Sequence, residues 1–271
     1  MPKHYHKVLT IAGTDSGGGA GVQADIKTFS ALGCYGMSVI TALTAQNTTG
    51  VRSVFPVSTT FIAEQIDAVM SDIGADAVKI GMLFSSEIIE VVAERLDFYG
   101  IENIVLDPVM AAQSGDKLLM DSAVATMKKL LFPKAKIITP NLPEASMILS
   151  REISDTDMVE EAARDIAFYG CKAVLIKGGH LDNKSAAMDL LFIPEDDHIV
   201  TFTEDRIDTK NNHGTGCTLS SAIAACIAKG NSLENAVRAA KAYITGAIKA
   251  GASYEIGKGH GPVHHFYNIW Q

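Results

Sequence analysis

The chain has 271 residues, of which 47% are hydrophobic and 20% are charged. This balance is typical of a folded globular protein and excludes a largely disordered chain. The length fits one large α/β domain, so we expect residues 1–271 to form a single domain. The formal net charge of −8 argues against a nucleic acid as the main partner, because binding to a phosphate backbone needs a basic surface.

The four cysteines form neither a dense disulfide framework nor a CxxC pair. Residues 1–7 lack the apolar core that a signal peptide has. Residues 28–51 contain no charged side chain, but their glycines and threonines, with Gln46 and Asn47, make them too polar for a membrane helix. We therefore expect a soluble, cytoplasmic protein in which these residues form a helix end and a buried strand.

Short apolar runs alternate with stretches of helical spacing along the whole chain. In chain order, the first half is predicted to form a strand at 8–11, a helix at 20–32, a strand at 38–43, a helix at 61–73, a strand at 77–80, a helix at 88–96 and a strand at 104–106. The second half is predicted to form strands at 137–138 and 173–176 around a helix at 158–169, an antiparallel pair at 189–193 and 198–202, and helices at 217–228 and 233–250. This alternation indicates βαβ units and a mainly parallel sheet with helices on both faces.

Polar residues and glycines follow, or lie at the end of, several of these apolar runs. They are Gly13, Gln46, Gly81, Asp107, Asn141 and Lys177. In parallel α/β sheets, ligands bind beyond the carboxyl ends of the strands. The sequence therefore predicts a binding site at this edge of the sheet.

A glycine-rich segment at residues 14–21 lies between the first strand and the first helix. Part of it fits the loose G-x-G-x-x-A pattern of dinucleotide-binding proteins. That pattern needs an acidic residue about twenty positions later, and no Asp or Glu occurs between Asp25 and Glu64. The chain also lacks a G-x-x-x-x-G-K-[ST] phosphate loop. Neither a dehydrogenase nor a P-loop kinase is indicated, and the segment alone is compatible with a simple tight turn.

A second glycine-containing segment, residues 208–217, runs directly into a helix. Glycines ahead of a helix let its free N–H groups converge on an anion, and the helix dipole favours negative charge there. This is a suitable place for a phosphoryl group in transfer. Cys217 lies at the start of this helix, a position that lowers the pKa of a thiol. The alternative is an inert buried cysteine, which is our interpretation of Cys226.

Three further sites carry chemically useful side chains. Asn141 and Glu144 follow a strand, although Pro143 and Glu144 are also typical of the first turn of a helix. Asp107 after one strand and Lys177 after another suit a magnesium ligand and a phosphate contact, unless each is a solvated loop charge. The histidines near the end lack the HExxH spacing of a zinc site, and we interpret them as structural: His260, His264 and His265.

Together these motifs resemble those of the hydroxymethylpyrimidine/phosphomethylpyrimidine kinases of thiamine biosynthesis, within the ribokinase-like superfamily. The resemblance covers nearly the whole chain, in the blocks AGTDSGGGAGVQADIKTFSALG, ITALTAQNT, KIGML, VLDPVM, ITPNLPEA, KGGH, KNNHGTGC and GKGHGPVHHF. So many blocks in the right order make it specific. It implies one α/β/α sandwich, a homodimer, the use of ATP and Mg²⁺, and two consecutive phosphoryl transfers. The first transfer goes to a hydroxymethyl oxygen and the second to the phosphate so formed.

The resemblance also implies roles for individual residues. The pyrimidine pocket would be lined by Gly13, Asp25, Gln46, Met82 and Val109. The anion hole would be made by Gly214, Thr215 and Gly216, with Cys217 facing the acceptor oxygen. Magnesium and the phosphates would be organised by Asp107, Asn141 and Glu144, while Lys177 and Thr209 would lie along the nucleotide. The wider superfamily has an aspartate base where this chain has Cys217, which leaves the identity of the base open.

Two alternatives remain. A pyridoxal kinase of the same branch shares the cysteine-ended motif, but its members tend to lack Gln46. The amide of Gln46 offers a donor and an acceptor side by side, which matches the ring nitrogen and amino group of an aminopyrimidine. A nucleotide-binding regulatory module without turnover is the second alternative, and the presence of Asp107, Glu144 and the glycine segment argues against it.

Overall fold

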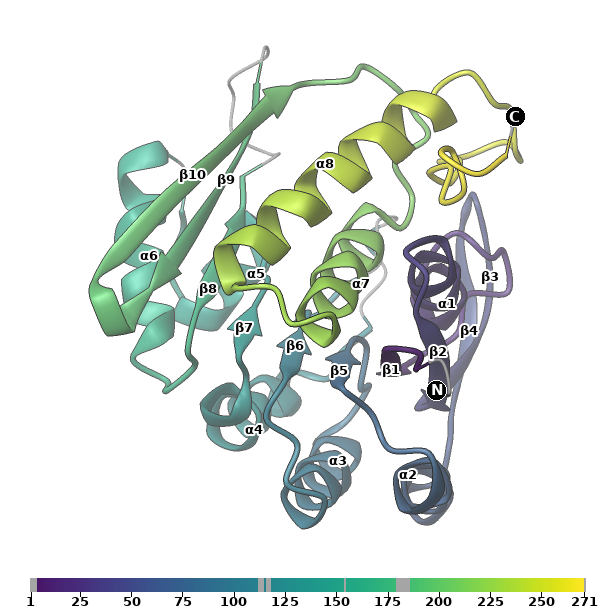
Figure 1. Ribbon diagram of the computed structural model, residues 1–271, viewed down its shortest axis with the longest axis vertical. Coiled ribbons are helices and arrows are strands. Elements are labelled where there is room, and N and C mark those ends of the chain that lie inside the picture. Colours follow the sequence, from purple (N-terminus) through teal and green to yellow (C-terminus); the bar gives the residue numbers. More distant parts are fainter. Residues whose placement is uncertain (1–3, 112–114, 116–117, 154, 179–185, 271) are drawn as a thin grey trace.

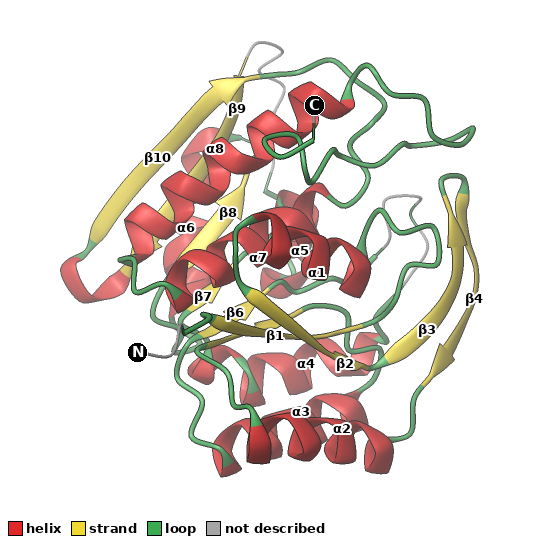
Figure 2. Cartoon of the chain, turned by 45° about the vertical axis from the view of Figure 1, so that its right-hand side comes forward, coloured by secondary structure: helices red, strands yellow, loops and turns green. Residues whose placement is uncertain are grey.

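The computed structural model describes residues 4–270 apart from 112–114, 116–117, 154 and 179–185. One eight-stranded sheet lies between two layers of helices (Figures 1 and 2). Its strands, in spatial order, are β10 (His198–Asp205), β9 (Ala186–Ile193), β8 (Val174–Lys177), β7 (Ile137–Ile138), β6 (Ile104–Leu106), β5 (Ala77–Ile80), β1 (Lys7–Ala12) and β2 (Tyr35–Ile40). The helices are α1 (Gly21–Ala31), α2 (Thr59–Asp72), α3 (Ser86–Phe98), α4 (Asp121–Leu130), α5 (Leu142–Leu149), α6 (Thr156–Ala167), α7 (Thr215–Ala228) and α8 (Leu233–Gly251).

The sheet is mainly parallel. Strands β2, β1, β5, β6, β7 and β8 pair in parallel, and only β9 and β10 run antiparallel to their neighbours. The predicted fold class, an α/β/α sandwich with a mainly parallel sheet, is confirmed, and so is the antiparallel pair formed by β9 and β10. Because the parallel strands point the same way, their carboxyl ends meet at one edge of the sheet.

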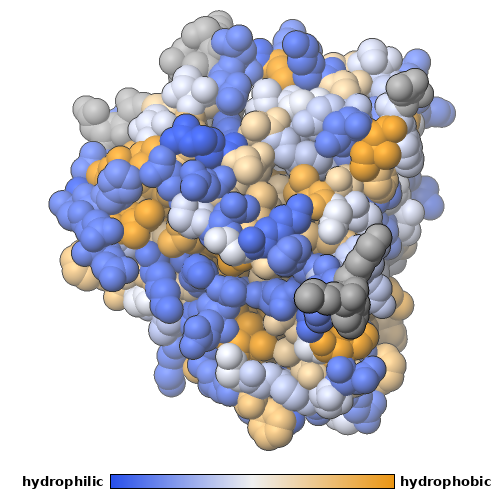
Figure 3. Space-filling model, in the orientation of Figure 1, coloured by the Kyte–Doolittle hydropathy of each residue, from blue (hydrophilic) through white to orange (hydrophobic). Residues whose placement is uncertain are grey.

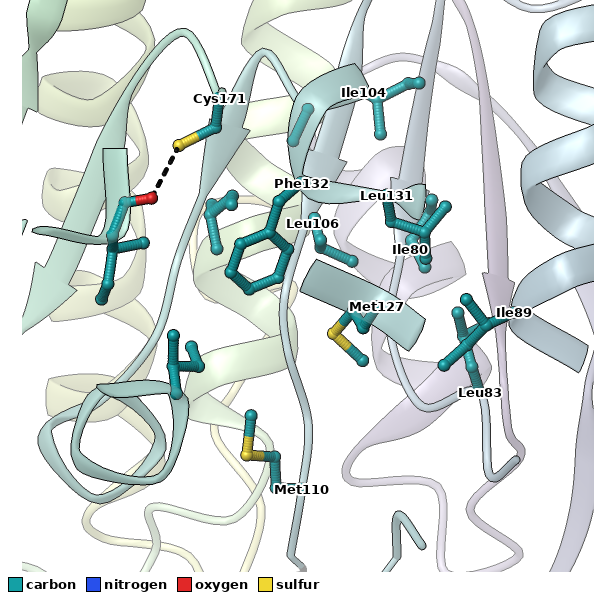
Figure 4. Packing of buried hydrophobic residues seen from close by; sticks show 14 of the residues in the cluster. Ile80, Leu83, Ile89, Ile104, Leu106, Met110, Met127, Leu131, Phe132 and Cys171 are labelled. Atoms are coloured by element: carbon teal, nitrogen blue, oxygen red, sulfur yellow. Dashed lines mark hydrogen bonds between the residues drawn. The ribbon is translucent and has the colours of Figure 1, made fainter. Parts of the chain in front are cut away.

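Residues along the strands alternate between two hydrophobic layers. Ile104 and Leu106 face one layer, whereas Val105 between them faces the other. The first layer is covered by α2 to α6, and Figure 4 shows part of it, with Phe132, Leu106 and Met127 packed between helices and sheet. The second layer is covered by α1, α7 and α8. This alternation follows from the two-residue period of a strand, which here buries apolar side chains on both faces.

A two-stranded hairpin stands apart from the main sheet. It consists of β3 (Ala42–Asn47) and β4 (Gly50–Pro56), paired antiparallel. The strand predicted at 38–43 was therefore wrong in its bounds, because β2 ends at Ile40 and the chain turns there into β3. Residues 28–51 contain no charged side chain, so their composition does not distinguish one buried strand from a strand followed by a hairpin. Gln46 consequently lies on the hairpin and not at the end of a strand of the main sheet.

Helices α4 and α5 were not predicted as elements. The turn before α5 is a capping box, in which Asn141 and Glu144 each accept a hydrogen bond from the backbone N–H of the other. The helix-entry interpretation of this segment is thus correct. The capping box also holds the Glu144 carboxyl in a fixed position at the carboxyl edge of the sheet.

The face of the molecule seen in Figure 3 carries mostly hydrophilic residues, with hydrophobic ones in small separate groups. Within the described part of the chain, no helix is both long and apolar enough to cross a membrane.

Candidate active site

A cavity of about 610 Å³ opens at the carboxyl ends of the parallel strands. The hairpin borders it on one side, and β9, β10 and α8 border it on the other. Between them lie the glycine-rich segment after β1 and the start of α7. Most residues predicted for the site line this one cavity: Gly13, Gln46, Met82, Asp107, Val109, Asn141, Glu144, Lys177, Thr209, Gly214, Thr215, Gly216 and Cys217.

The start of α7 forms a compact pocket of backbone groups. Gly214 caps the helix with φ of +81°, and a Cβ atom on it would lie 1.8 Å from the carbonyl oxygen of Gly19. Only glycine fits this position, both for its conformation and for the closeness of the other loop. The hydroxyl of Thr215 donates to the carbonyl of Asn212, which closes the turn. The N–H group of Thr215 also donates to the Asn212 carbonyl, whereas those of Gly216 and Cys217 have no intrahelical acceptor and are available to an anion.

The ammonium group of Lys177 lies beside Gly216 at the start of α7. A Cβ on Gly216 would be 3.3 Å from its Nζ atom, so the absence of a side chain at 216 makes room for the ammonium group. The same Nζ atom donates to Asp107 Oδ1 at 2.9 Å and lies 3.8 Å from Glu144 Oε2. One cation and two carboxylates therefore meet beside the anion-binding backbone. Carboxylate oxygens are ligands that Mg²⁺ prefers, and ammonium and backbone N–H groups suit phosphate.

Charges in this cluster compensate one another. Burial would raise the pKa of Asp107, but the ammonium groups of Lys177 and Lys79 outweigh burial and hold that pKa below its ordinary value. Burial would lower the pKa of Lys177, yet Asp107 and Glu144 raise it above its ordinary value. Thr139 and Ser220 also donate hydrogen bonds to Asp107. Asp107 is thus ionised and Lys177 is charged at neutral pH.

Glu144 behaves differently from Asp107. Burial raises its pKa to about 7, and the nearby Asp107 carboxylate adds to the rise, whereas Lys177 and the N–H group of Asn141 offset only part of it. A carboxyl group with this pKa exchanges its proton in the physiological range. The charge of the cluster therefore depends on whether a cation is present to stabilise the second carboxylate.

The expected lowering of the Cys217 pKa is wrong. Burial raises the pKa of the thiol to about 11; Lys79 opposes the rise, while Asp25 and Asp107 add to it. The helix start is present as predicted, but its effect is smaller than the cost of placing a thiolate among buried carboxylates. Cys217 is a neutral thiol at pH 7.

Asp25 was predicted to line the pyrimidine pocket, and the structure places it elsewhere. Its side chain is fully buried and does not line the cavity. It forms an ion pair with Lys79 at 2.9 Å and accepts hydrogen bonds from Thr10 and Ser221. A carboxylate with these partners is saturated, so Asp25 holds in place Lys79, which lines the cavity, and does not itself face a ligand.

The other residues predicted for the pyrimidine pocket lie together. Met82 belongs to a small apolar cluster with Ala42 and Leu118, against which Val109 packs. This cluster forms an apolar floor of the cavity. A Cβ on Gly13 would be 2.9 Å from the sulfur of Met82, so the backbone directly after β1 lies against the floor. Gln46 projects from β3 over the same part of the cavity, with its Oε1 atom 3.4 Å from Thr44 Oγ1. This end of the cavity suits a flat apolar ring with a polar edge.

Thr209 also lines the cavity, and its Oγ1 atom accepts a hydrogen bond from the Asn211 N–H group. Ile207, Ile244 and Ile248 provide apolar surface nearby. Gly179 and His180 of the KGGH block lie outside the described residues.

One pair of site residues escaped the sequence analysis. His213 Nε2 lies 2.8 Å from Asp15 Oδ2, and both side chains are buried. Asp15 also accepts hydrogen bonds from the N–H groups of Gly17, Gly19 and Ala20. Burial would raise the pKa of Asp15, but His213 and these N–H groups hold it below its ordinary value. The pair ties the first glycine-rich segment to the anion-binding loop, and its only signal in the sequence was that each residue adjoins a glycine motif.

Comparison with known proteins agrees with this geometry. The model of the phosphomethylpyrimidine kinase family matches residues 15–264. The chain belongs to this family. The hydroxymethylpyrimidine/phosphomethylpyrimidine kinase of Escherichia coli is 52% identical over 263 residues, which cover 97% of this chain and 98% of the relative. The resemblance inferred from the sequence blocks is thereby confirmed.

Two solved structures share the fold. A phosphomethylpyrimidine kinase from Clostridium difficile has 47% identity and a TM-score of 0.78, covering 89% of this chain and all but 1% of its own. The pyridoxal kinase from Staphylococcus aureus, solved with AMP-PCP and pyridoxal, has 36% identity and a TM-score of 0.90, covering 98% of this chain and 96% of its own. The fold therefore does not distinguish the two kinds of kinase, and the distinction must come from side chains in the cavity.

The close approach of Gly214 to Gly19 gives a test of the anion hole. Replacing Gly214 with alanine should lower phosphoryl transfer by about 100-fold or more, because the first-turn N–H groups lose their alignment. Gly230 at the end of α7 is a matched control: its φ is +83°, and nothing lies within 4 Å of a Cβ there. Gly230→Ala should cost about 1 kcal/mol of stability and leave the rate unchanged. Equal rates for both variants, measured at saturating substrate, would contradict an anion hole at Gly214.

Proposed function

We propose that the chain is an ATP-dependent kinase that phosphorylates 4-amino-5-hydroxymethyl-2-methylpyrimidine and then converts the monophosphate to the diphosphate. One observation carries the proposal: a single cavity is lined by Gln46 and the apolar floor at Met82, by the start of α7 and by Thr209. An acceptor ring at one end and a nucleotide at the other would meet beside Gly214, Lys177 and Asp107. The family match supports the same activity.

The phosphoryl group would be held where the first-turn N–H groups of α7 and the ammonium group of Lys177 converge. In each transfer the acceptor oxygen bonds to the γ-phosphorus of ATP, and the bond from that phosphorus to the bridging oxygen breaks, so that ADP leaves with the electron pair. Charge in such a transition state is spread over the phosphoryl oxygens. Backbone N–H groups and a fixed ammonium group stabilise that charge without reorganisation.

Asp107 and Glu144 are the residues that would hold Mg²⁺. Both carboxylates lie within 4 Å of one Lys177 Nζ atom, and oxygen ligands are those that this hard cation prefers. Among the described residues no cluster of three or more His, Cys, Asp or Glu side chains is placed to bind a metal. Two carboxylates suffice where substrate phosphates complete the coordination. When bound, the ion would neutralise phosphate charge.

The two acceptors differ in what they need from Cys217. The alcohol of the first transfer loses a proton, whereas the phosphate oxygen of the second is already ionised. The high pKa of Cys217 leaves almost no thiolate at neutral pH to take that proton. In a loose transition state the proton leaves late, so a strong base contributes little. We therefore propose that the Cys217 side chain lines the anion hole as an uncharged thiol and does not act as the base.

A pyridoxal kinase is the second candidate, and the TM-score of 0.90 to a pyridoxal kinase is the observation that favours it. Gln46 on the hairpin favours the pyrimidine, because the donor and acceptor of its amide match the amino group and ring nitrogen of an aminopyrimidine. The homodimer, the single domain over residues 1–271 and the cytoplasmic location stay predictions from the sequence.

A turnover panel with Gln46→Met tests the proposal. The wild type should phosphorylate the hydroxymethylpyrimidine and its monophosphate with ATP and Mg²⁺, and pyridoxal less efficiently. The methionine variant should lose about 1–3 kcal/mol of pyrimidine transition-state binding, because the polar edge of the ring is left unpaired in a buried site. Pyridoxal should lose less. Equal losses for both rings would show that Gln46 does not read the acceptor, and no turnover of any acceptor would favour a regulatory module.

Magnesium dependence tests Glu144. Because its pKa is about 7, the group loses its proton between pH 6 and 8, and only the carboxylate is a good ligand. The Mg²⁺ concentration for half-maximal rate should therefore fall as the pH rises through this range. Glu144→Gln should raise that concentration and flatten its pH dependence. Glu161→Gln, which alters an exposed carboxyl paired with Arg151, serves as the control. Identical profiles for the two variants would count against the role.

The two transfers measured separately test Cys217. If the thiol is part of the wall of the anion hole, Cys217→Ala should slow both transfers by similar factors, within about threefold of each other, because both pass through the same phosphoryl transition state. A general base would instead show as a loss of about 10²–10⁴-fold confined to the alcohol. Selective loss of the first transfer, with the second intact, would show instead that Cys217 is the general base.

A further inference from the structure

Residues 257–262, which we call the strap, cross between two parts of the site that are far apart in the sequence. On one side the strap contacts the tip of the β3–β4 hairpin. On the other it contacts the loop that leads into α7. Nothing in the proposed chemistry uses it directly.

Contacts with the hairpin tip centre on Thr48. The N–H group of His260 donates to the Thr48 carbonyl at 2.9 Å, and the N–H group of Gly259 donates to Thr48 Oγ1 at 3.2 Å. The approach is close: a Cβ on Gly259 would lie 1.9 Å from the Thr48 carbonyl oxygen, and one on Gly257 would lie 2.3 Å from Thr48 Oγ1. The strap fits this tip only as long as both positions are glycine.

Contacts with the anion-binding loop are equally direct. The N–H group of His213 donates to the Gly261 carbonyl at 3.0 Å, and His260 Nδ1 lies 3.2 Å from Asn212 Oδ1. A Cβ on Gly261 would lie 2.0 Å from Asn211 Oδ1. Asn211 in turn donates to the carbonyls of Gly251 and Tyr254, which anchors the loop to the end of α8.

The hairpin is also attached to the segment that follows β1. At the base of the hairpin Thr14 bonds to Ala42 and Thr44, and next to the tip Ser16 exchanges hydrogen bonds with the backbone of Gln46. The strap adds a contact at Thr48, two residues beyond Gln46, and this contact connects the tip to the loop before α7. Gln46 therefore lies between the Ser16 contact and the strap, so the strap helps to determine how far its amide stands from Gly214.

We propose that the strap sets the separation between the acceptor-reading hairpin and the phosphoryl-binding loop, with Thr48 and Gly259 as positioning residues. This inference rests on the proposed function, because it assumes that Gln46 reads the acceptor. A positioning error of about 1 Å can cost up to about 100-fold in rate, although neither residue touches the substrate.

Gly259→Ala is the main variant. The added methyl group should displace the hairpin tip, raise the KM for the pyrimidine alcohol about tenfold or more, and leave the affinity for ADP unchanged. Amide hydrogen exchange of residues 46–50 should become faster, and this readout does not depend on any activity. Thr48→Val, which removes one acceptor and keeps the shape, should change KM and exchange in the same direction, by about threefold. Thr48→Ser keeps the hydroxyl and should behave like the wild type.

Thr49→Val is the matched control, because the Thr49 hydroxyl donates to Asn47 within the turn. It should leave the acceptor KM unchanged. If Gly259→Ala does not fold, the comparison of Thr48→Val with Thr48→Ser decides. Unchanged exchange at the tip in both main variants, or equal losses of acceptor and ADP binding, would overturn the proposal. A wild type inactive on pyrimidines would disprove the proposed function, while the exchange measurement would still test the strap.

Discussion

The candidate active site depends on a row of buried charges that alternate in sign, from Asp25 on α1 to Glu144 at the carboxyl edge of the sheet. Asp25, Lys79, Asp107, Lys177 and Glu144 follow one another, with ion pairs of 2.9 Å at Asp25–Lys79 and at Asp107–Lys177. Lys79 also interacts with Asp107 and so connects the two pairs. A buried charge without a partner costs about 3–5 kcal/mol, a large part of the stability of a whole domain. The row is stable because each charge has a neighbour of opposite sign, and this constraint brings a lysine and two carboxylates to the start of α7.

The last member of the row is the one that is not fully compensated. Lys177 lies between two carboxylates, and it stabilises Asp107 at 2.9 Å more strongly than Glu144 at 3.8 Å. Burial raises the pKa of Glu144 to about 7, because the weaker interaction with Lys177 offsets only part of the effect of burial. The same capping box that begins α5 prevents Glu144 from turning away. The unliganded site thus holds one carboxyl group in a state that a divalent cation would ionise, so that binding of the metal completes the alternation of charge.

The parts of the site differ in how far the sequence could predict them. The strands at 104–106 and 173–176, followed by Asp107 and Lys177, were predictable, because a buried parallel strand and a charge after it leave few alternatives. Asp25 was misplaced because a carboxylate on a helix near the site can face either the cavity or a buried lysine, and Lys79 lies in a run read as apolar. His213 and Asp15 lie 198 positions apart in the chain. Their contact depends on how the two loops dock, which local patterns do not contain.

For Cys217 the helix start was predicted correctly, but the direction of the pKa shift was not. The sequence placed it properly in the first turn of a helix, where the dipole contributes about 0.3–1 kcal/mol. The rise of its pKa from 9.0 to about 11 corresponds to about 3 kcal/mol in favour of the neutral thiol. The larger effect comes from burial beside Asp25 and Asp107, and only the tertiary structure brings those carboxylates near.

A site that serves both acceptors must solve a geometric problem. The nucleophilic oxygen of the monophosphate is two bonds further from the ring than that of the alcohol, yet both must reach the same phosphorus. The start of α7 cannot follow, because Gly214 is fixed by its own conformation and by the carbonyl of Gly19. If the start of α7 is the anion hole, we expect the ring to shift along the cavity between the two transfers. Its floor includes Met82, whose unbranched thioether adapts to different neighbours, so the pocket can remain packed in both positions. The rigid start of α7 at Gly214 would then fix the place of the phosphoryl transfer, and the adaptable floor at Met82 would accept the two substrates.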